Sequence, residues 1–597
     1  MSKQTTDDLL LAILSAYNLY PEDTSTYKIH QKVFNILKSK CYGRRVAMWG
    51  AGDIGNEKGT YVAKFMDKYA YMFQQAVCVV DARKDYEGRS LMGLPIILPK
   101  NLPTYSADII LITSFSSRKE IKKDIQQAFP DVECLDIYEE LALQGIELHK
   151  DIFHDTVVYV DIYKKRLEYE KCLDPEQKGL HLKSLIQKYI NIRDIPYVLK
   201  FVREYIANKY TDYQRMQQLE KELEAFLQAL KDKVRKNTED VLLIFLDAFR
   251  GCDWYDGEKG KFNVMEEISR KSACFVNMNA TGPVTYESMY SIITGKMPMD
   301  GDVYERTEFR LDEFPFLDEL HREDYDIKMY FSDAYSPIDV SEAVEYHRSV
   351  YLSEELWCVL CEMADGSKPC VHFLDATTEL HVPFLCGYHT VMPQKMTFSE
   401  MGVSHNVSLE LLKEQFQNSL DYVDLEMNFF HQFINEKVFK VIFSDHSHVV
   451  YDEEKELPFY MYYNDISRSV HNVLMISGDG IAPQIIDSLA SMKEFNAILL
   501  EAYRDHRILV PKDKIVQYQY YPIVNKNIRD KAREYDNAVH FIDGIKCFRS
   551  DEYLAVYTAD GYEELYRFDG KNAVPCTMEE AASFVTEVKE QFDISFA

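Results

Sequence analysis

The sequence predicts an α/β protein built of more than one domain. Short apolar runs of strand length, such as residues 108–114 and 241–246, alternate with amphipathic stretches of helix length. The chain has 597 residues, 46% of them hydrophobic, which is enough for two or three separate cores. We expect a small parallel α/β domain near the N-terminus, a helical connector, and a larger α/β domain over residues 239–597.

Residues 1–35 are expected to form an N-terminal helix. The stretch LLLAILSAYNLY at 9–20 is amphipathic, and we expect it to pack on the small α/β domain that follows. Asp7 and Asp8 precede this stretch and no small-residue cleavage site follows it, which argues against a signal peptide.

A small parallel α/β domain is predicted over residues 36–150. Gly50, Gly52 and Gly55 form the pattern G-x-G-x-x-G after a short apolar strand, and Asp81 closes the next apolar run, AVCVV. Such a turn can hold the phosphates of a nucleotide while the acidic residue holds its ribose. The segment resembles the Rossmann-like domains attached to enzymes of bacterial surface-sugar biosynthesis, which implies a nucleotide or nucleotide-sugar ligand. Alternatively, the glycines only permit tight packing between strand and helix.

Residues 151–238 are predicted to be a helical connector, because they contain long amphipathic stretches and no strand-like alternation. Apolar residues recur there at spacings of three and four, which predicts one buried helix face. They are Met216, Leu219, Leu223, Phe226, Leu227 and Leu230. This face is expected to pack against a domain of the same chain or against another subunit, so a homo-oligomer formed through the connector is one expectation.

Two buried strands of the C-terminal domain are each followed by candidate metal ligands. Asp247 comes after the apolar run 241–246, and Asp445 and His446 come after the run 441–443. Ligands bind at the carboxyl ends of strands in open α/β sheets. Carboxylates together with an imidazole suit zinc or manganese.

Thr285 is the candidate nucleophile. Gly282 and Pro283 break the chain before it, and residues 286–294 have the length and composition of a helix that ends at Gly295. Free N–H groups at the start of this helix would stabilise an alkoxide and the oxygens of an anionic substrate. Alternatively, the Thr285 hydroxyl only caps the helix. Arg250 is expected either to clamp a substrate oxygen or to form a surface ion pair.

Residues 239–597 resemble the alkaline phosphatase superfamily, and within it the branch of sulfatases, phosphonate monoester hydrolases and phosphoethanolamine or phosphoglycerol transferases. The matching segments are LDAFRGCD at 246–253, SDHSH at 444–448, HFLDATTELHVPF at 372–384 and the terminal segment at 549–570. The resemblance implies an α/β sandwich fold. It also implies that Thr285, ten residues before Gly295, is the nucleophile and that His381 assists the leaving group.

Two departures from the family pattern narrow the expected chemistry. Formylglycine sulfatases need Cys or Ser followed by x-Pro-Ser-Arg, whereas this chain reads TYESM from Thr285. Phosphate chemistry is therefore favoured over sulfate hydrolysis. Two-metal members of the family add further Asp and His ligands, for which Asp375, His381, and either His448 or His471 are the candidates. We expect one metal and leave a second open.

Composition disfavours several classes of partner. There are 97 acidic and 68 basic residues, and the net charge of −29 disfavours nucleic acid and anionic membrane surfaces. No stretch approaches the roughly 20 consecutive apolar residues of a membrane span. Twelve cysteines without a secretory signal are typical of reduced thiols, so we expect a cytoplasmic protein.

The sequence therefore predicts a metal-dependent phosphotransferase or phosphoesterase with a threonine nucleophile. Its expected substrate is a small molecule or a glycan carrying a phosphoester, including nucleotide-sugar precursors. Two alternatives remain at this point. One is a non-catalytic nucleotide-sugar binding or scaffold protein with a degenerate sulfatase-like domain, and the other is a sulfuric ester hydrolase.

Overall fold

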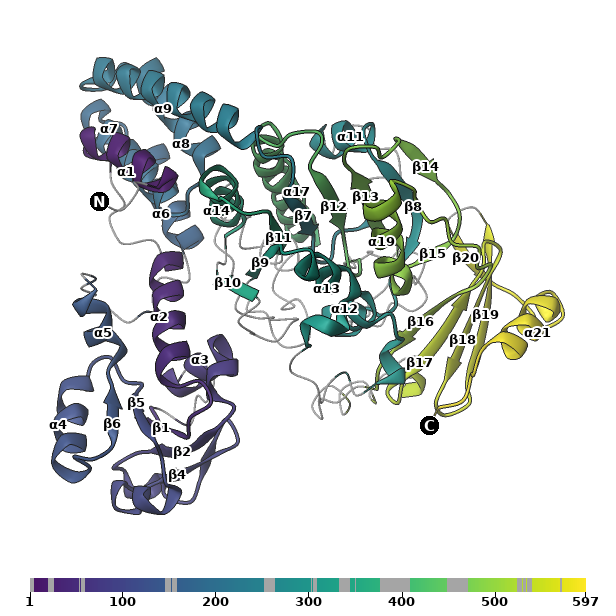
Figure 1. Cartoon of the computed structure of the whole chain (residues 1–597), viewed down its shortest axis with the longest axis horizontal. Coiled ribbons are helices and arrows are strands. Elements are labelled where there is room, and N and C mark those ends of the chain that lie inside the picture. The colour runs from purple at the N-terminus through teal and green to yellow at the C-terminus, as the bar shows by residue number, and fades with distance from the viewer. Residues whose placement is uncertain are drawn as a thin grey trace.

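The computed structural model describes most of the chain. The described residues are 5–19, 26–52, 54, 60–144, 146, 152, 158–251, 263–301, 303, 309–331, 344–348, 351–375, 409–447, 471–522, 529, 533, 539–569 and 572–596. They form three β-sheets with helices packed on them, so the predicted α/β class is confirmed. In Figure 1 the N-terminal and C-terminal sheets lie at opposite ends of the molecule, and the largest sheet lies between them.

The N-terminal sheet has six strands in the order β3-β4-β2-β1-β5-β6. β1 pairs in parallel with both β2 and β5, as the alternation of strands and helices predicts. Its strands are β1 (Val46–Trp49), β2 (Ala76–Val80), β3 (Ser90–Leu91), β4 (Leu94–Ile97), β5 (Ile109–Ile112) and β6 (Glu133–Leu135). The helices of this part are α2 (Thr26–Lys40), α3 (Tyr61–Lys68), α4 (Arg118–Ala128) and α5 (Ile137–Leu143).

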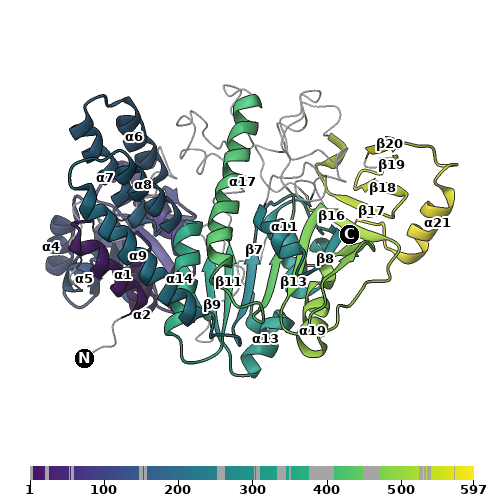
Figure 2. The same cartoon turned by 90° about the horizontal axis from the view of Figure 1, so that it is seen from above.

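A group of four helices follows among the described residues from 158 to 234. They are α6 (Val158–Lys171), α7 (Pro175–Asn191), α8 (Ile195–Ala207) and α9 (Tyr213–Val234). The predicted apolar face of α9 is buried within the chain, because α9 packs against α8, α1 (Thr6–Ala16) and α14 (Leu352–Asp365). Figure 2 shows this helical group on one side of the large sheet. No helix within the described ranges is long and apolar enough to cross a bilayer.

The expectation for the N-terminal helix is wrong in one respect. The first 35 residues contribute two helices, α1 (Thr6–Ala16) and α2. α2 packs on α5 of the N-terminal part and also on β10 (Val344–Arg348) of the large sheet, whereas α1 packs on α9 and on α14 (Leu352–Asp365). An amphipathic pattern shows that one face is buried but does not identify the surface that covers it.

The large sheet has nine strands in the order β10-β9-β11-β7-β12-β13-β8-β14, with β15 also paired to β8. Its strands are β7 (Val241–Phe245), β8 (Ala273–Asn279), β9 (Asp326–Phe331), β10 (Val344–Arg348), β11 (Cys370–Asp375), β12 (Phe439–Phe443), β13 (His471–Ser477), β14 (Gln484–Ile486) and β15 (Ala490–Ser491). The helices on this sheet are α11 (Asn263–Ser269), α12 (Thr285–Thr294), α13 (Pro315–Arg322), α14, α17 (Leu409–His431) and α19 (Phe495–Asp505).

β7 lies in the interior of this sheet and is buried on both faces. It pairs in parallel with β11 on one side and with β12 on the other. Val241, Leu243 and Phe245 belong to one hydrophobic core, whereas Leu242 and Ile244 belong to another. This two-sided burial explains why the sequence shows a continuous apolar run rather than alternation.

The C-terminal sheet has five antiparallel strands in the order β16-β17-β18-β19-β20. They are β16 (Val516–Tyr520), β17 (Ile545–Arg549), β18 (Tyr553–Thr558), β19 (Glu563–Asp569) and β20 (Asn572–Pro575), and α21 (Ala582–Gln591) covers one face. The other face has its own small core, which includes Ala280 from the end of β8. The C-terminal sheet therefore packs beside the edge of the large sheet.

Candidate active site

Two neighbouring strands of the large sheet end at the same level, and each carries an aspartate just beyond its end. Phe245 of β7 pairs with Phe443 of β12, so Asp247 and Asp445 each follow a paired residue by two positions. Asp247 is 2% exposed and Asp445 is fully buried. The parallel register therefore brings two carboxylates together where β7 and β12 end.

A strained turn after β7 forms a hydrogen bond to the end of β12. Ala248, directly after Asp247, has a φ of +58°, which is unfavourable for a residue with a side chain. In this conformation the Ala248 N–H donates to Oδ1 of Asp445 over 3.2 Å. The His446 N–H donates to the same oxygen over 2.7 Å. The Asp445 carboxylate is thus held by backbone from both strand ends.

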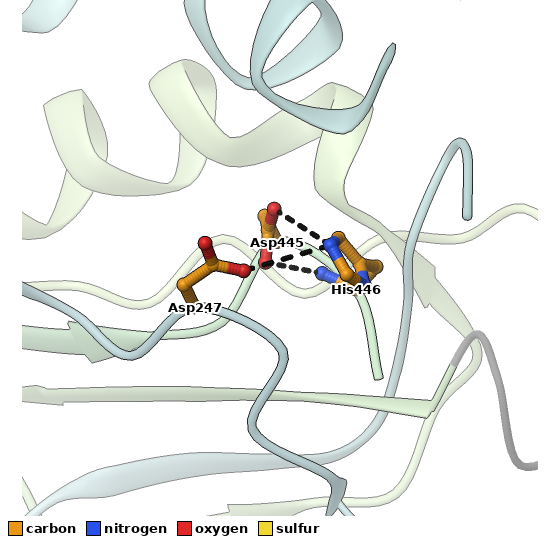
Figure 3. Close-up of side chains that lie close together, drawn as sticks. All are labelled: Asp247, Asp445 and His446. Atoms are coloured by element: carbon orange, nitrogen blue, oxygen red, sulfur yellow. Dashed lines mark hydrogen bonds and ion pairs between the residues drawn. The ribbon is translucent and has the colours of Figure 1, made fainter. Parts of the chain in front are cut away.

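His446 presents its Nε2 to both carboxylates (Figure 3). Nδ1 lies 3.1 Å from the carbonyl oxygen of Ser447, so a proton on Nδ1 satisfies that oxygen and leaves the lone pair on Nε2. Nε2 is 3.4 Å from Oδ2 of Asp445 and 3.6 Å from Oδ1 of Asp247. A ring proton given to a backbone carbonyl is the usual support of a metal-binding histidine.

The three side chains fit a divalent metal ion. One ligand atom from each of Asp247, Asp445 and His446 lies within 4.8 Å of the others, and all three residues are buried. Two carboxylate oxygens and one imidazole nitrogen form the donor set of a catalytic zinc or manganese site with a position left for water or substrate.

Thr285 faces this cluster from the start of α12. Its Oγ1 is 3.4 and 3.5 Å from the two carboxylate oxygens of Asp247 and 3.3 Å from Nε2 of His446. Val284 occupies the N-cap position and makes no side-chain capping bond, so Thr285 is the first helical residue. The hydroxyl is therefore turned toward the carboxylates and imidazole and does not cap its own helix.

The other sequence candidates lie in different surroundings. Asp375 is buried at the end of β11, where it pairs with Phe245, two positions short of Asp247. Nε2 of His471 lies 2.8 Å from the carbonyl oxygen of Val276, and burial lowers the pKa of its imidazole. Arg250 is half-buried in the turn after β7. Neither Asp375 nor His471 belongs to the three-residue cluster found among the described residues.

His381 and His448 lie outside the described residues, as does Gly55 of the glycine pattern.

Asn472 is a supporting residue that sequence reasoning missed. It is fully buried, and its side-chain nitrogen donates to the carbonyl oxygens of Ser444 and Asp445 over 2.9 and 2.6 Å. It thereby fixes the backbone that carries the Asp445 carboxylate. The available signal was a polar residue inside the otherwise apolar strand segment HNVLMIS.

In the N-terminal sheet, the Asp81 carboxylate already has four donors. Oδ2 accepts hydrogen bonds from the Ala51 N–H, at 3.0 Å, and from Nη2 of Arg83, at 2.7 Å. Oδ1 accepts the backbone N–H and Nε of Arg83, at 3.0 and 2.8 Å. A carboxylate offers about four lone-pair sites, so a ribose hydroxyl would have to displace one of these donors.

The two described glycines of this turn have a packing role. Gly50 has a φ of +116° and Gly52 a φ of +70°. A Cβ at Gly50 would lie 3.2 Å from Oγ1 of Thr113, on the neighbouring strand segment. These observations support the interpretation that the glycines permit close packing.

Comparison with known families and proteins gives matches of limited extent. A family described as "C2185-like, N-terminal" matches residues 42–131, which is the part of the chain that contains the N-terminal sheet. No curated protein matches the chain.

Solved structures resemble the chain over more than half of its length. A protein from Bacteroides thetaiotaomicron, provisionally described as a sulfatase, is 12% identical, with 59% of this chain and 91% of that chain covered and a TM-score of 0.45. The phosphonate monoester hydrolase of Agrobacterium radiobacter is 12% identical, with coverages of 59% and 94% and a TM-score of 0.44. A member of the alkaline phosphatase superfamily from Vibrio parahaemolyticus is 13% identical, with coverages of 62% and 97% and a TM-score of 0.37.

Proposed function

We propose that the protein is a metal-dependent enzyme that cleaves or transfers a phosphate ester, with Thr285 as its nucleophile. The observation that supports this most strongly is the position of the Thr285 hydroxyl, 3.3–3.5 Å from the Asp247 carboxylate and the His446 imidazole. A hydroxyl, two buried carboxylates and an imidazole at the mouth of parallel strands match the needs of phosphoryl transfer. The motif resemblance to the alkaline phosphatase superfamily agrees with this proposal.

Asp247, Asp445 and His446 would hold the metal, for which zinc and manganese are the candidates. When bound, a divalent cation favours the alkoxide form of a nearby hydroxyl and neutralises charge on the phosphoryl oxygens. The Ser447 carbonyl oxygen accepts a hydrogen bond from Nδ1–H of His446, which orients the ring so that the Nε2 lone pair would face the metal.

In the proposed reaction, Thr285 Oγ1 gives its proton to the Asp247 carboxylate, to which it already donates, and attacks phosphorus. The bond from phosphorus to the leaving oxygen breaks, and that oxygen takes up a proton, for which His381 remains the predicted donor. Water or an acceptor hydroxyl then attacks the phosphothreonine and gives its proton to the group that protonated the first leaving oxygen. The bond from phosphorus to Oγ1 breaks, and Thr285 takes back the proton held by Asp247. The positive end of the α12 helix dipole, at Thr285, favours the negative charge of the phosphoryl oxygens.

Threonine favours phosphate over sulfate as the group transferred, because it cannot be converted to formylglycine in the way that Cys or Ser is. Glycan phosphoesters and nucleotide-sugar precursors are the proposed substrates, by resemblance. A cytoplasmic location and a division of the chain at about residues 35, 150 and 238 are part of the same proposal.

The proposal is tested by turnover of nitrophenyl phosphate, phosphodiester, phosphonate and sulfate esters with zinc, manganese or chelator. We expect chelator-sensitive turnover of a phosphorus ester that Thr285→Ala abolishes. Thr294→Ala is the matched control, since Thr294 lies in the last turn of the same helix and donates to Tyr290. Loss of turnover in both variants, or preference for the sulfate ester, would contradict the proposal. Absence of both turnover and bound metal would favour a scaffold protein.

A further inference from the structure

The segment that carries Thr285 is held by the C-terminal sheet. It begins at Asn279, the last residue of β8, and reaches α12 through residues 280–284. Two residues of the C-terminal sheet donate hydrogen bonds to it. Arg549 at the end of β17 donates from Nη1 to Oδ1 of Asn279 over 2.6 Å, and the Gln519 N–H on β16 donates to the carbonyl oxygen of Thr281 over 2.8 Å.

The side-chain amide of Asn279 is held in one orientation by its own hydrogen bonds. The side-chain nitrogen of Asn279 donates to the carbonyl oxygens of Asn277 and Ala490, at 2.9 and 3.1 Å. Oδ1 must therefore face Arg549, whose Nη2 also reaches Oδ1 of Asn277 at 3.4 Å. Asn279 is 1% exposed, so water does not compete for these bonds.

The charge of Arg549 has few polar partners in its surroundings. Burial lowers the pKa of its guanidinium to about 10, so it stays charged at neutral pH. Among the described residues it makes no ion pair, and its Nε has no hydrogen-bond partner. Its charge meets two amide oxygens and the ring of Phe568, whose centroid is 5.2 Å away, and it is attracted by the Asp551 carboxylate. Arg549 is half-buried, and both hydrogen bonds of its guanidinium go to the strand end that leads to Thr285.

Gln519 holds α12 at both ends. Its backbone N–H contacts Thr281, before the helix, and its side-chain Oε1 accepts the Met299 N–H, after the helix, over 2.7 Å. Gln519 is itself 1% exposed. Within the segment, Ser288 Oγ donates to the Gly282 carbonyl oxygen over 2.8 Å, which joins the loop to the second turn of the helix.

We propose that the C-terminal sheet is a positioning element of the active site, in which Arg549 and Gln519 fix the segment 279–299 and thereby the place of Thr285 relative to Asp247 and His446. The proposal rests on the proposed function for its catalytic consequence. The positional part can be measured without turnover.

The first measurement is hydrogen exchange of the full chain with Arg549→Gln and Gln519→Met. We expect faster exchange of the amides of residues 280–288 in Arg549→Gln, and faster exchange of the Met299 amide in Gln519→Met, which loses the side-chain acceptor but keeps the backbone bond to Thr281. Exchange at Ala248 and His446, on the metal-binding side, should be unchanged in both variants. Arg567→Gln is the matched control, because Arg567 is an exposed arginine on β19 of the same sheet. Unchanged exchange of 280–288 in Arg549→Gln, or a loss of protection throughout the C-terminal sheet, would overturn the proposal.

The second measurement is kcat and KM on the ester that the wild type turns over. We expect Arg549→Gln to lower kcat about 100-fold, the effect of a displacement of about 1 Å, with a smaller change in KM and unchanged metal content. Arg549→Lys should recover part of kcat, because it restores the charge and one donor. A kcat that falls only in proportion to lost metal or lost folded protein would contradict positioning. Altered exchange together with no wild-type turnover would retain the positional inference and reject the proposed function.

Discussion

The ligand atoms of Asp445 and His446 are positioned by hydrogen bonds with neighbouring residues. Ala248 reaches Asp445 because its backbone takes a positive φ, and His446 presents Nε2 because the Ser447 carbonyl oxygen holds Nδ1. Asn472 bridges the two carbonyl oxygens at the end of β12. Changing such supporting residues should alter metal affinity without removing a ligand.

Asn472→Leu tests this expectation. The substitution removes both donors to the backbone that carries Asp445, so we expect zinc or manganese affinity to fall about tenfold or more, with Thr285 unchanged. Calorimetric titration of the metal-free protein measures the effect. A variant that binds metal as tightly as the wild type would show that the turn holds its shape without Asn472.

Lys440 is the buried cation of β12, at the edge opposite the site. Burial, and to a smaller degree the Lys271 ammonium, lower its pKa from 10.5 to about 8 in the folded protein. Between pH 8 and pH 10.5 the unfolded chain therefore holds this proton while the folded chain releases it, and stability rises with pH. Below pH 8 both states are protonated, and the folded state carries the full cost of the buried charge.

We therefore expect Lys440→Met to be more stable than the wild type at pH 7, and its advantage to shrink by about 3 kcal/mol as the pH rises from 8 to 10.5. Denaturant unfolding at several pH values measures this difference. The exposed Lys437→Met is the control and should show no such trend. An advantage that does not change with pH would mean that Lys440 keeps its ordinary pKa.

At the scale of elements, the ends of β7, β12 and α12 meet at one edge of the large sheet. Their types could be predicted from the sequence, because β7 and β12 are apolar runs followed by polar residues and α12 lies between Gly282 and Gly295. The pairing of Phe245 with Phe443 could not, since the order of strands in a sheet depends on contacts distant in sequence. The contacts of Asn472, Gln519 and Arg549 could not be predicted from the sequence for the same reason.

Gly251 shows how closely these elements approach one another. A Cβ at this position would lie 2.9 Å from the carbonyl oxygen of His471 and 3.0 Å from that of Asn472. Gly251→Ala must therefore push the turn after β7 away from β13. We expect a loss of about 1–3 kcal/mol in stability and a roughly tenfold weaker metal affinity, because Asp247 and Asn472 move apart. Metal titration and thermal unfolding measure the two effects, and a stability loss with unchanged affinity would separate this turn from the site.

At the scale of the whole molecule, the site lies at the carboxyl ends of interior strands of the large sheet, and parts distant in sequence pack around that sheet (Figures 1 and 2). Asp7 holds α1 against the rest of the chain. Its carboxylate accepts hydrogen bonds from Nε and Nη2 of Arg193, at 2.8 and 3.1 Å, and from Nε1 of Trp357, at 2.9 Å. Arg193 is 4% exposed, so its charge depends on Asp7.

Asp7→Asn should therefore release α1. Removing one partner of a buried ion pair costs about 3–5 kcal/mol, because the other charge stays buried. We expect the free energy of opening of the α1 amides to fall by about 3 kcal/mol in hydrogen exchange, with metal content unchanged. Asp8→Asn is the control, since Asp8 is exposed and, among the described residues, its side chain bonds to Thr5 at the start of the helix. Equal effects of both substitutions would mean that helix capping, and not Arg193, holds α1.

The most direct test of the proposed mechanism is to quench the metal-loaded protein during turnover of a phosphorus ester and locate the phosphoryl group by mass spectrometry. The account predicts phosphorylation of Thr285 alone, and none after chelation or in Asp445→Asn. Phosphorylation of a different residue, or undiminished turnover by Thr285→Ala, would contradict it.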